Sequence, residues 1–256
     1  IFLEWDNVGK KWINDKLSSA RFQGFPVDMA WKCEPDGIIE CSIETPRQMV
    51  VRKPTGEFEY LPYYSLEKDD MSSIYFDGSV MLFGVGNSSK DVVINRQNSW
   101  DSLAPMLKLV HKALAVLFGG HVYLFDGGKG EECSRETQVY NYEMNQWEMA
   151  SQMPLACSGG VAVAFYDAIY VFGGEVPTCM KYVPKQDQWT ELTPPPGTIP
   201  KATAVAWKGT IWVYGTNYVQ LYNPESDSWT ERHPEFNREH DGTCIFLTKL
   251  THTRNE

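Results

Sequence analysis

Three segments in the second half of the chain repeat one spacing, in which a tyrosine is followed seven residues later by a tryptophan. The pairs are Tyr140 with Trp147, Tyr182 with Trp189, and Tyr222 with Trp229. A polar run lies between the two aromatic residues each time, and its Asn, Asp, Pro and Ser residues favour turns. The spacing therefore indicates a hairpin that recurs along the chain.

The pattern continues toward the N-terminus, which turns three hairpins into a repeat that covers the sequence. The anchor residues are Trp12, Phe58, Trp100, Trp147, Trp189 and Trp229, about 40 to 47 residues apart. The expected cross-strand partners of the first three are Trp5, Val51, and Val93 or Ile94. A repeat of this length is typical of solenoids, propellers or arrays.

The content of one repeat decides between these architectures. Residues 113–118 form an apolar run that ends at Gly119-Gly120, and residues 122–125 form a second run before Gly127-Gly128. An alternating stretch over 137–142 and the segment around Trp147 follow, so the repeat contains four short strands. Six such units predict an all-β fold, a six-bladed β-propeller with four-stranded antiparallel blades.

The recurring residues have physical roles in such a fold. A glycine pair at the end of the second strand lets backbones approach closely near the centre of the ring. Each tryptophan on the outermost strand is a large apolar plate that fills the wedge between neighbouring sheets. We therefore interpret the tryptophans as core residues.

A glycine pair after an apolar strand, then a tyrosine, then a tryptophan seven residues later resembles the kelch repeat, most clearly over residues 112–229. The early units depart from it, because GIIECSIET replaces a strand like IYVFGG and Phe58 replaces tryptophan. The glycine pair is also broken in VMLFGVGN and WVYGTN. The strand register before about residue 80 stays open for this reason.

Residues 1–256 are expected to form a single propeller domain whose ring is closed by a C-terminal innermost strand. The first unit holds only two outer strands, IFLEW and KKWINDKL, and the tail GTCIFLTKL has the pattern of an innermost strand without a blade of its own. The second strand of that first blade is expected upstream of Ile1.

Composition excludes several classes of partner. The net charge is −10, whereas nucleic-acid binding needs clustered Lys and Arg. The longest apolar stretch, over 113–118, is too short to span a bilayer. The sequence thus predicts no nucleic-acid partner and no membrane contact. The six cysteines have no metal-ligand spacing, and are expected to be reduced thiols of a cytoplasmic, or cytoskeleton-associated, protein; they are Cys33, Cys41, Cys133, Cys157, Cys179 and Cys244.

Catalysis has little support in the sequence. The five histidines form no close ligand pair, which argues against the copper site of kelch-type oxidases. The Asp boxes of propeller sialidases, Gly-rich phosphate loops and G-x-S-x-G motifs are missing from the sequence. We expect a non-catalytic protein without cofactor or metal.

The predicted function is capture of a partner protein or peptide on one face of the ring. Loops that join the second strand to the third, and the fourth strand to the next blade, gather on that face, where function usually concentrates. A mixed-sign patch there favours a polar peptide over an apolar groove. The candidate binding residues are Arg47, Tyr64, Asn87, His111, Lys129, Glu131, Glu132, Arg135, Ser158, Glu175, Lys201, Asn217 and Tyr218.

The chain resembles in particular the C-terminal half of BTB-kelch proteins. That resemblance implies a BTB and BACK region upstream, homodimerisation, and recruitment of a substrate degron to a cullin-3 ubiquitin ligase through the BTB domain. Two alternatives stay open, a cytoskeletal scaffold that binds actin or microtubules and an F-box–kelch adaptor.

Overall fold

The fold consists of antiparallel sheets that follow one another along the chain. The computed structural model describes residues 3–6, 11–14, 38–41, 49–52, 58–62, 72–76, 79–85, 90–110, 113–125, 134–157, 159–199, 202–207, 209–214 and 219–232. The described part has no α-helix, only a 3-10 turn at η3 (Pro184–Gln186). The expectation of an all-β fold is confirmed for these residues.

Six sheets lie within the described residues, and we number them I to VI in chain order. They contain β1 (Leu3–Asp6) and β2 (Lys11–Asn14) in sheet I; β3 (Ile38–Cys41), β4 (Met49–Arg52) and β5 (Phe58–Tyr60) in sheet II; β6 (Ser72–Phe76), β7 (Ser79–Val85), β8 (Asp91–Arg96) and β9 (Ser99–Ser102) in sheet III; β10 (Leu114–Phe118), β11 (His121–Phe125), β12 (Thr137–Asn141) and β13 (Gln146–Ala150) in sheet IV; β14 (Val161–Phe165), β15 (Ala168–Phe172), β16 (Cys179–Val183) and β17 (Gln188–Glu191) in sheet V; and β18 (Thr203–Trp207), β19 (Thr210–Tyr214), β20 (Val219–Asn223) and β21 (Ser228–Arg232) in sheet VI.

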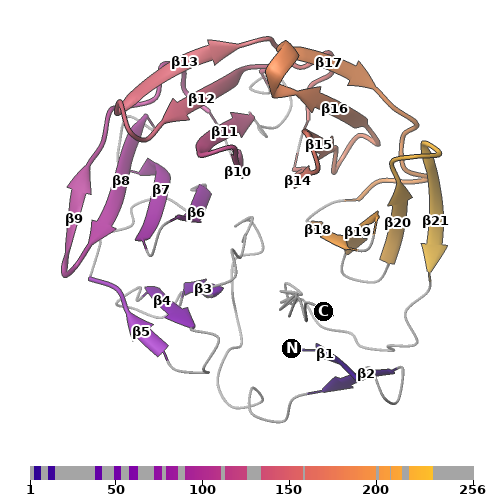
Figure 1. Cartoon of the computed structure of the whole chain (residues 1–256), viewed down its shortest axis with the longest axis horizontal. Coiled ribbons are helices and arrows are strands. Elements are labelled where there is room, and N and C mark those ends of the chain that lie inside the picture. Colours follow the sequence, from indigo (N-terminus) through magenta and orange to yellow (C-terminus); the bar gives the residue numbers. More distant parts are fainter. Residues whose placement is uncertain are drawn as a thin grey trace, which may run out of the picture.

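The strands of each sheet pair in chain order, and every predicted anchor residue lies on the last strand of its sheet. Figure 1 shows the sheets around a common centre, with β6, β10, β14 and β18 nearest to it and β9, β13, β17 and β21 at the rim. Sheets III to VI have the predicted four strands. The tail GTCIFLTKL lies outside the described residues.

The predicted cross-strand pairing holds in four sheets. Tyr140 pairs with Trp147, Tyr182 with Trp189 and Tyr222 with Trp229, and Trp5 pairs with Trp12 in sheet I. Four residues separate the paired ends of β12 and β13, as the hairpin between Asn141 and Gln146 shows.

The predicted partners in sheets II and III are wrong. Phe58 pairs with Arg52 rather than Val51, and Trp100 pairs with Asn95 rather than Val93 or Ile94. In sheet III the hairpin closes between Arg96 and Ser99, so its turn is two residues shorter than the corresponding turns of sheets IV, V and VI. A fixed spacing of seven therefore overshoots there, because a shorter turn brings the opposing residue closer in sequence.

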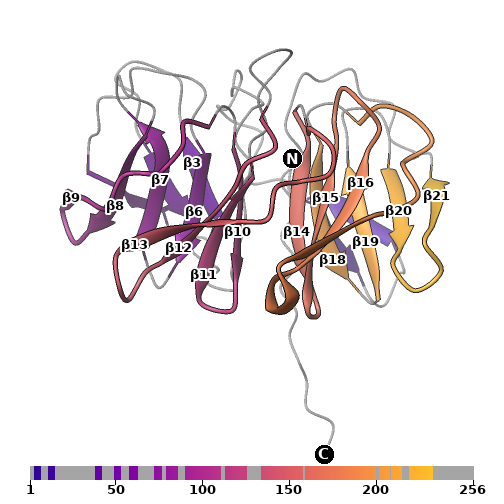
Figure 2. The ribbon, with the colours of Figure 1, turned by 90° about the horizontal axis from the view of Figure 1, so that it is seen from above.

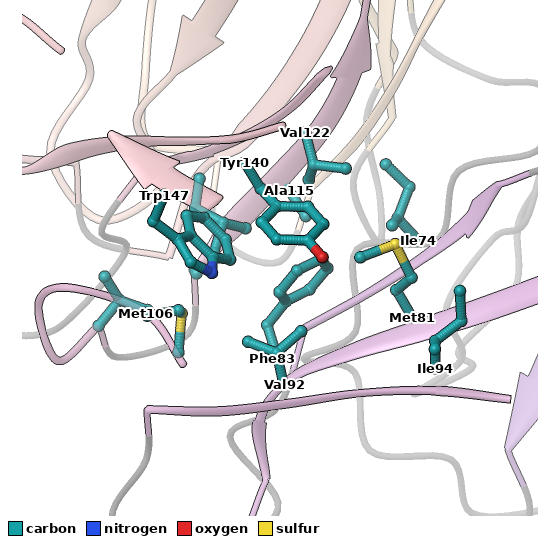
Figure 3. Packing of buried hydrophobic residues seen from close by; sticks show 13 residues of the cluster. Ile74, Met81, Phe83, Val92, Ile94, Met106, Ala115, Val122, Tyr140 and Trp147 are labelled. Carbon is teal, nitrogen blue, oxygen red and sulfur yellow. The ribbon is translucent and has the colours of Figure 1, made fainter. Parts of the chain in front are cut away.

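The hydrophobic core is divided among the gaps between neighbouring sheets. Between sheets III and IV, Met81, Phe83 and Ile94 pack against Tyr140 and Trp147 (Figure 3). Equivalent clusters fill the gap between sheets IV and V and the gap between sheets V and VI. Because sheets IV and V bury both of their faces in this way, each of them depends on its two neighbours for stability.

Each of the last three anchor tryptophans meets a phenylalanine on the second strand of the preceding sheet. Trp147 contacts Phe83, Trp189 contacts Phe125 and Trp229 contacts Phe172, with ring centroids 5.3–6.1 Å apart in edge-to-face geometry. Edge-to-face pairs are favourable beyond the area that they bury. The interpretation of these tryptophans as plates between sheets is confirmed.

The same tryptophans also make a polar contact with the preceding sheet. The indole Nε1–H of Trp147 donates to the carbonyl of Ala104 at 2.8 Å, and Trp189 and Trp229 do the same to Ser151 and Thr193. Trp100 donates in the same way to Pro62 at 2.9 Å. Each accepting carbonyl lies just after the outermost strand of the sheet before, so the indole ties that strand end to the next sheet.

In sheets IV, V and VI, a second contact to the same strand end comes from the turn residue two positions before the anchor tryptophan. Asp187 accepts hydrogen bonds from the Tyr182 hydroxyl at 2.7 Å and from the Ser151 N–H at 2.8 Å. Asn145 and Asp227 bond in the same way to Tyr140 and Ala104, and to Tyr222 and Thr193. We call this set of tyrosine, Asn or Asp, and tryptophan the intersheet clamp.

The clamp places its turn residue in the left-handed region, where φ is +49° for Asn145, +50° for Asp187 and +46° for Asp227. Asn and Asp tolerate that region better than other non-glycine residues. The sequence analysis interpreted these polar runs as turn formers only. Their second role, bridging two sheets, is visible only in the structure.

Glycine has two roles in the described residues, one in a tight turn and one where the backbone folds back closely on itself. Gly119 and Gly120 turn the chain between β10 and β11 with φ of +59° and +79°. At Gly173, after β15, a Cβ would lie 2.2 Å from Thr178 Oγ1 and 2.4 Å from the Val176 carbonyl. Only glycine lets the loop after this strand fold back so closely.

Candidate interaction face

The topology sorts the connections between strands into two groups. Because the strands are antiparallel and paired in chain order, the loops from second to third strand and the connectors between sheets share one end. We call this end the loop face, and the opposite end, with the β10–β11, β12–β13, β14–β15 and β16–β17 hairpins, the hairpin face. Figure 2 shows these two ends from the side, with the β10–β11 and β14–β15 turns on the hairpin face.

Two of the predicted binding residues lie within the described part of the chain, and both are on the loop face. Arg135 precedes β12, and Glu175 lies in the loop between β15 and β16. Both are exposed, and their role in binding stays a prediction. The remaining candidates lie outside the described residues; they are Arg47, Tyr64, Asn87, His111, Lys129, Glu131, Glu132, Ser158, Lys201, Asn217 and Tyr218.

Arg135 has a structural contact that the sequence did not suggest. Its guanidinium Nη1 donates to the Pro154 carbonyl at 3.2 Å, and its own carbonyl accepts from the Met153 N–H at 2.9 Å. Lys90 makes the equivalent contacts one sheet earlier. Its Nζ donates to the Leu107 carbonyl, and its own carbonyl accepts from the Met106 N–H, both at 2.9 Å. A cation thus fastens each of these two connectors to the adjacent loop.

The three connectors between sheets III and VI share one plan. Each has two buried residues four positions apart, Met106 and Val110, Met153 and Cys157, or Pro195 and Ile199. The three residues between them point away from the core and are exposed or half-buried. The connectors therefore display the triplets Leu-Lys-Leu over 107–109, Pro-Leu-Ala over 154–156 and Pro-Gly-Thr over 196–198 on the loop face.

The displayed triplets include apolar side chains that the sequence analysis missed. Leu107 and Leu109 are 44% and 42% exposed, and Leu155 is 37% exposed. Val176, beside Glu175, is also exposed. The sequence signal was the pair of apolar residues four apart, but only burial distinguishes the anchors from the displayed leucines. The described part of the loop face thus includes apolar side chains beside the predicted polar ones.

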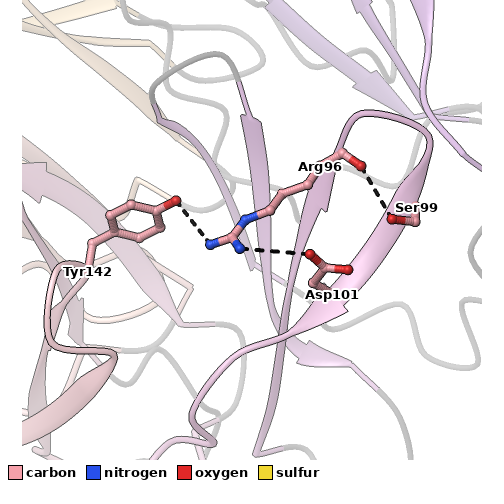
Figure 4. A network of polar contacts seen from close by, with 4 residues as sticks. All are labelled: Arg96, Ser99, Asp101 and Tyr142. Carbon is pink, nitrogen blue, oxygen red and sulfur yellow. Dashed lines mark hydrogen bonds and ion pairs between the residues drawn. The ribbon is translucent and has the colours of Figure 1, made fainter.

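A polar network links sheets III and IV away from the loop face (Figure 4). Arg96 donates from Nη2 to the Tyr142 hydroxyl at 3.3 Å and lies 3.8 Å from Asp101 Oδ2. The Tyr142 contact raises the pKa of Arg96. All of these groups are solvent-accessible, and exposed ion pairs contribute little to stability. We interpret the network as an accessory link between two sheets.

The described residues hold no metal-binding cluster, and two of the cysteines among them are buried. Within them, no three His, Cys, Asp or Glu side chains lie close enough to hold a metal ion. Cys157 and Cys179 are buried and form no disulfide, and burial raises the pKa of the Cys179 thiol well above its usual range. A buried, protonated thiol is a poor nucleophile. None of the helices in this part of the chain could span a membrane.

Comparison with known proteins shows what the chain is similar to. It is 26% identical to human Kelch-like protein 23 over 164 residues, which is 59% of this chain and 29% of that protein. It is 33% identical to Kelch repeat and BTB domain-containing protein 2 of Pongo abelii over 122 residues, 47% of this chain and 19% of that protein. Beta-scruin of Limulus polyphemus is 25% identical over 54% of this chain and 18% of that protein. No family model matches the chain.

The fold has its own likeness among solved structures. The structure of YjhT covers 70% of this chain with a TM-score of 0.57 at 15% identity, so the likeness is one of fold. The chain spans less than a third of the length of the curated relatives that it matches. In its repeat and in its fold, this chain resembles the kelch-repeat β-propeller that forms the C-terminal part of BTB-kelch proteins.

Proposed function

We propose that this chain is a non-catalytic interaction module that captures a partner protein on its loop face. The observation that carries the proposal is the contrast between the two ends of the sheets. Short hairpins close one end, whereas the other end presents the longer loops and the connectors with their displayed side chains. Side chains on loops that a rigid scaffold holds in place are well suited to recognition.

The finer form of the proposal follows the resemblance to Kelch-like and BTB-kelch proteins. The propeller is a closed six-bladed ring that recruits a substrate degron to a cullin-3 ubiquitin ligase. A BTB domain elsewhere in the whole protein supplies the cullin-3 contact and homodimerisation, and the protein acts in the cytoplasm. The similarity to Kelch repeat and BTB domain-containing protein 2 supports this reading.

A cytoskeletal scaffold is the second candidate. The similarity to Beta-scruin supports this second candidate, because that relative is not named as a BTB-kelch protein. Both candidates use the loop face for binding and differ in the partner. Cullin-3 that co-purifies with the whole protein supports the adaptor, and co-sedimentation with actin filaments or microtubules supports the scaffold.

The test reverses charges on one face at a time. We expect Arg135→Glu with Glu175→Lys to abolish capture of the partner, since charged contacts buried by a partner contribute about 2–5 kcal/mol when truncated. Affinity purification followed by mass spectrometry measures the capture. The Arg135 hydrogen bond to Pro154 is exposed, so its loss lowers stability by only about 1 kcal/mol.

A matched control lies on the hairpin face of the same two sheets. Glu143 and Lys185 are both exposed in the β12–β13 and β16–β17 hairpins, and Glu143→Lys with Lys185→Glu makes the same exchange of charges. We expect this variant to retain its partner. Loss of the partner in the control alone would place the site on the hairpin face and contradict the proposal.

A further inference from the structure

The connectors of sheets III–IV and IV–V form a surface whose chemistry the proposed function does not specify. The displayed side chains are Leu107, Lys108, Leu109 and Leu155, and the cations that fasten the connectors are Lys90 and Arg135. We call these six residues the leucine–cation strip. The strip combines apolar and basic side chains on the loop face.

The backbone under Leu107, Lys108 and Leu109 is held at four points. The Met106 N–H donates to the Lys90 carbonyl, and Lys90 Nζ donates to the Leu107 carbonyl. The buried Gln138 side chain accepts from the Lys108 N–H at 2.8 Å and donates to the Lys108 carbonyl at 3.1 Å. A segment fixed this firmly loses little conformational entropy when a partner binds. The leucines are thus presented by a rigid backbone.

The same plan is repeated with different residues in the next two connectors. Arg135 takes the place of Lys90, with its guanidinium on Pro154, and Leu155 is displayed. In the following connector, Pro177 stands at the position equivalent to Lys90 and Arg135, and the displayed triplet over 196–198 has no leucine. The leucines and the cations therefore occur together in two connectors and are lost together in the third.

The charge of the strip selects its partner. Lys90, Lys108 and Arg135 are basic in a chain of net charge −10, and the contact to Pro154 uses one of the five donors of the Arg135 guanidinium. The acidic neighbour Glu136 accepts a hydrogen bond from Gln152 Nε2 at 3.3 Å. The exposed Asp91 follows Lys90, and successive side chains at the start of a strand point to opposite faces.

We propose that the leucine–cation strip binds a partner segment in which aliphatic side chains alternate with carboxylates. The aliphatic groups pack on Leu107, Leu109 and Leu155, and the carboxylates take charge-assisted hydrogen bonds from the cations. The proposal rests on the proposed capture of a partner at the loop face, and it names the chemistry of the segment that is captured.

The experiment selects short random peptides displayed on phage against the folded protein, with no assumption about composition. We expect the selected peptides to be enriched in Asp and Glu beside Leu, Ile or Val. Fluorescence anisotropy of a selected peptide then measures the effect of Leu107→Ser, Leu109→Ser and Leu155→Ser together, which we expect to weaken binding about tenfold or more. Lys108→Glu weakens binding and lowers its dependence on salt.

The control uses the exposed apolar residues of the hairpin face. Tyr166 is 82% exposed in the β14–β15 hairpin and Met144 is exposed in the β12–β13 hairpin; Tyr166→Ser with Met144→Ser leaves binding unchanged. Enrichment of basic peptides, no enrichment, or a leucine variant that binds normally overturns the inference. If the leucine variant binds normally and Glu175→Lys removes binding, the proposed function survives. If only the hairpin-face variant loses binding, both proposals fail.

Discussion

Sheet III and sheet V use the same tryptophan contact but differ in the residue opposite the tryptophan and in the turn before it. Trp100 and Trp189 both donate from Nε1 to a carbonyl at the end of the preceding sheet. In sheet V, Tyr182 and Asp187 complete the clamp. In sheet III, Asn95 stands opposite Trp100, and its side-chain oxygen accepts instead from the Val80 N–H of its own sheet. The indole contact therefore does not need the tyrosine and the turn residue.

The difference in turn length explains the difference in bonding. The four-residue turn of sheet V brings Asp187 back toward the preceding sheet, where it meets Ser151. The two-residue turn of sheet III ends before any residue can take that position. Among the described residues, sheets IV, V and VI are thus linked to the preceding sheet by both the tryptophan and the turn residue. Sheet III is linked by the tryptophan.

The largest expected loss of stability comes from removing the tryptophan, which is the part of the link that all four sheets share. Trp147 is 8% exposed and contacts Phe83, so we expect Trp147→Ala to lower the free energy of unfolding by about 3–5 kcal/mol. Trp100 is half-buried, and Trp100→Ala is expected to cost less. Denaturant unfolding measures both. Equal losses below about 1 kcal/mol, the scatter of surface substitutions, would show that the indoles are not structural.

A smaller loss of stability is expected from removing the turn residue of the clamp, which is found in sheets IV, V and VI. Asp187→Ala removes the acceptor of the Tyr182 hydroxyl and the Ser151 N–H, and we expect it to cost about 1–2 kcal/mol. Asn98→Ala in the turn of sheet III, at the same distance before its tryptophan, is the matched control and should change little. A cost at Asn98 as large as at Asp187 would contradict this role of the turn residue.

Low pH should weaken the clamps of sheets V and VI, which contain aspartate, more than the clamp of sheet IV, which contains asparagine. Burial acts to raise the pKa of Asp187, but hydrogen bonds from Ser151 and Tyr182 outweigh it, and the pKa of Asp187 is lowered; Asp227 behaves in the same way. A lowered folded pKa contributes stability that is present above the ordinary aspartate pKa of about 3.9 and is lost as the pH falls through the folded value. Asn145, which does not titrate, occupies the same position in sheet IV.

Melting temperatures measured between neutral pH and about pH 3 test this point. We expect Asp187→Asn with Asp227→Asn to keep the acceptor oxygen and to reduce the loss of stability in acid below that of the unsubstituted protein. Asn145→Asp should increase the acid loss. Parallel pH profiles for all three proteins would mean that these carboxylates do not couple to folding.

The smallest effect concerns the short turn itself. Gln97 has a φ of +54° in the turn of sheet III, so Gln97→Gly relieves an unfavourable conformation and is expected to stabilise by about 0.5–1 kcal/mol. Gly119 has a φ of +59° with open space around it, and Gly119→Ala should destabilise by about 1 kcal/mol for the converse reason. Thermal unfolding of the two variants should shift in opposite directions.

The sequence predicted the local features of these sheets better than their contacts. The spacing of Tyr140, Tyr182 and Tyr222 to their tryptophans predicted hairpins, strand order and packing between sheets, because those depend on local periodicity. The register of sheet III was mispredicted, since a turn two residues shorter shifts the pairing without disturbing the apolar pattern.

The bridging role of Asp187 and the display of Leu107 depend on contacts between distant segments. No local pattern encodes a hydrogen bond from Asp187 to Ser151 or the burial of Met106 and Val110 on either side of an exposed triplet. For the site, topology predicted that Arg135 and Glu175 lie on one face. It could not predict the apolar content of that face, because apolar residues in connectors are usually interpreted as core.

The most direct test of the central claim, that the loop face takes the partner, is site-specific photocrosslinking in cells. Benzoylphenylalanine replaces Leu109 on the loop face in one protein and Tyr166 on the hairpin face in another, since both side chains are exposed. We predict that the position 109 protein forms adducts with the partner that co-purifies with the unsubstituted protein, and that the position 166 protein does not. Adducts with that partner from position 166 alone would contradict the account.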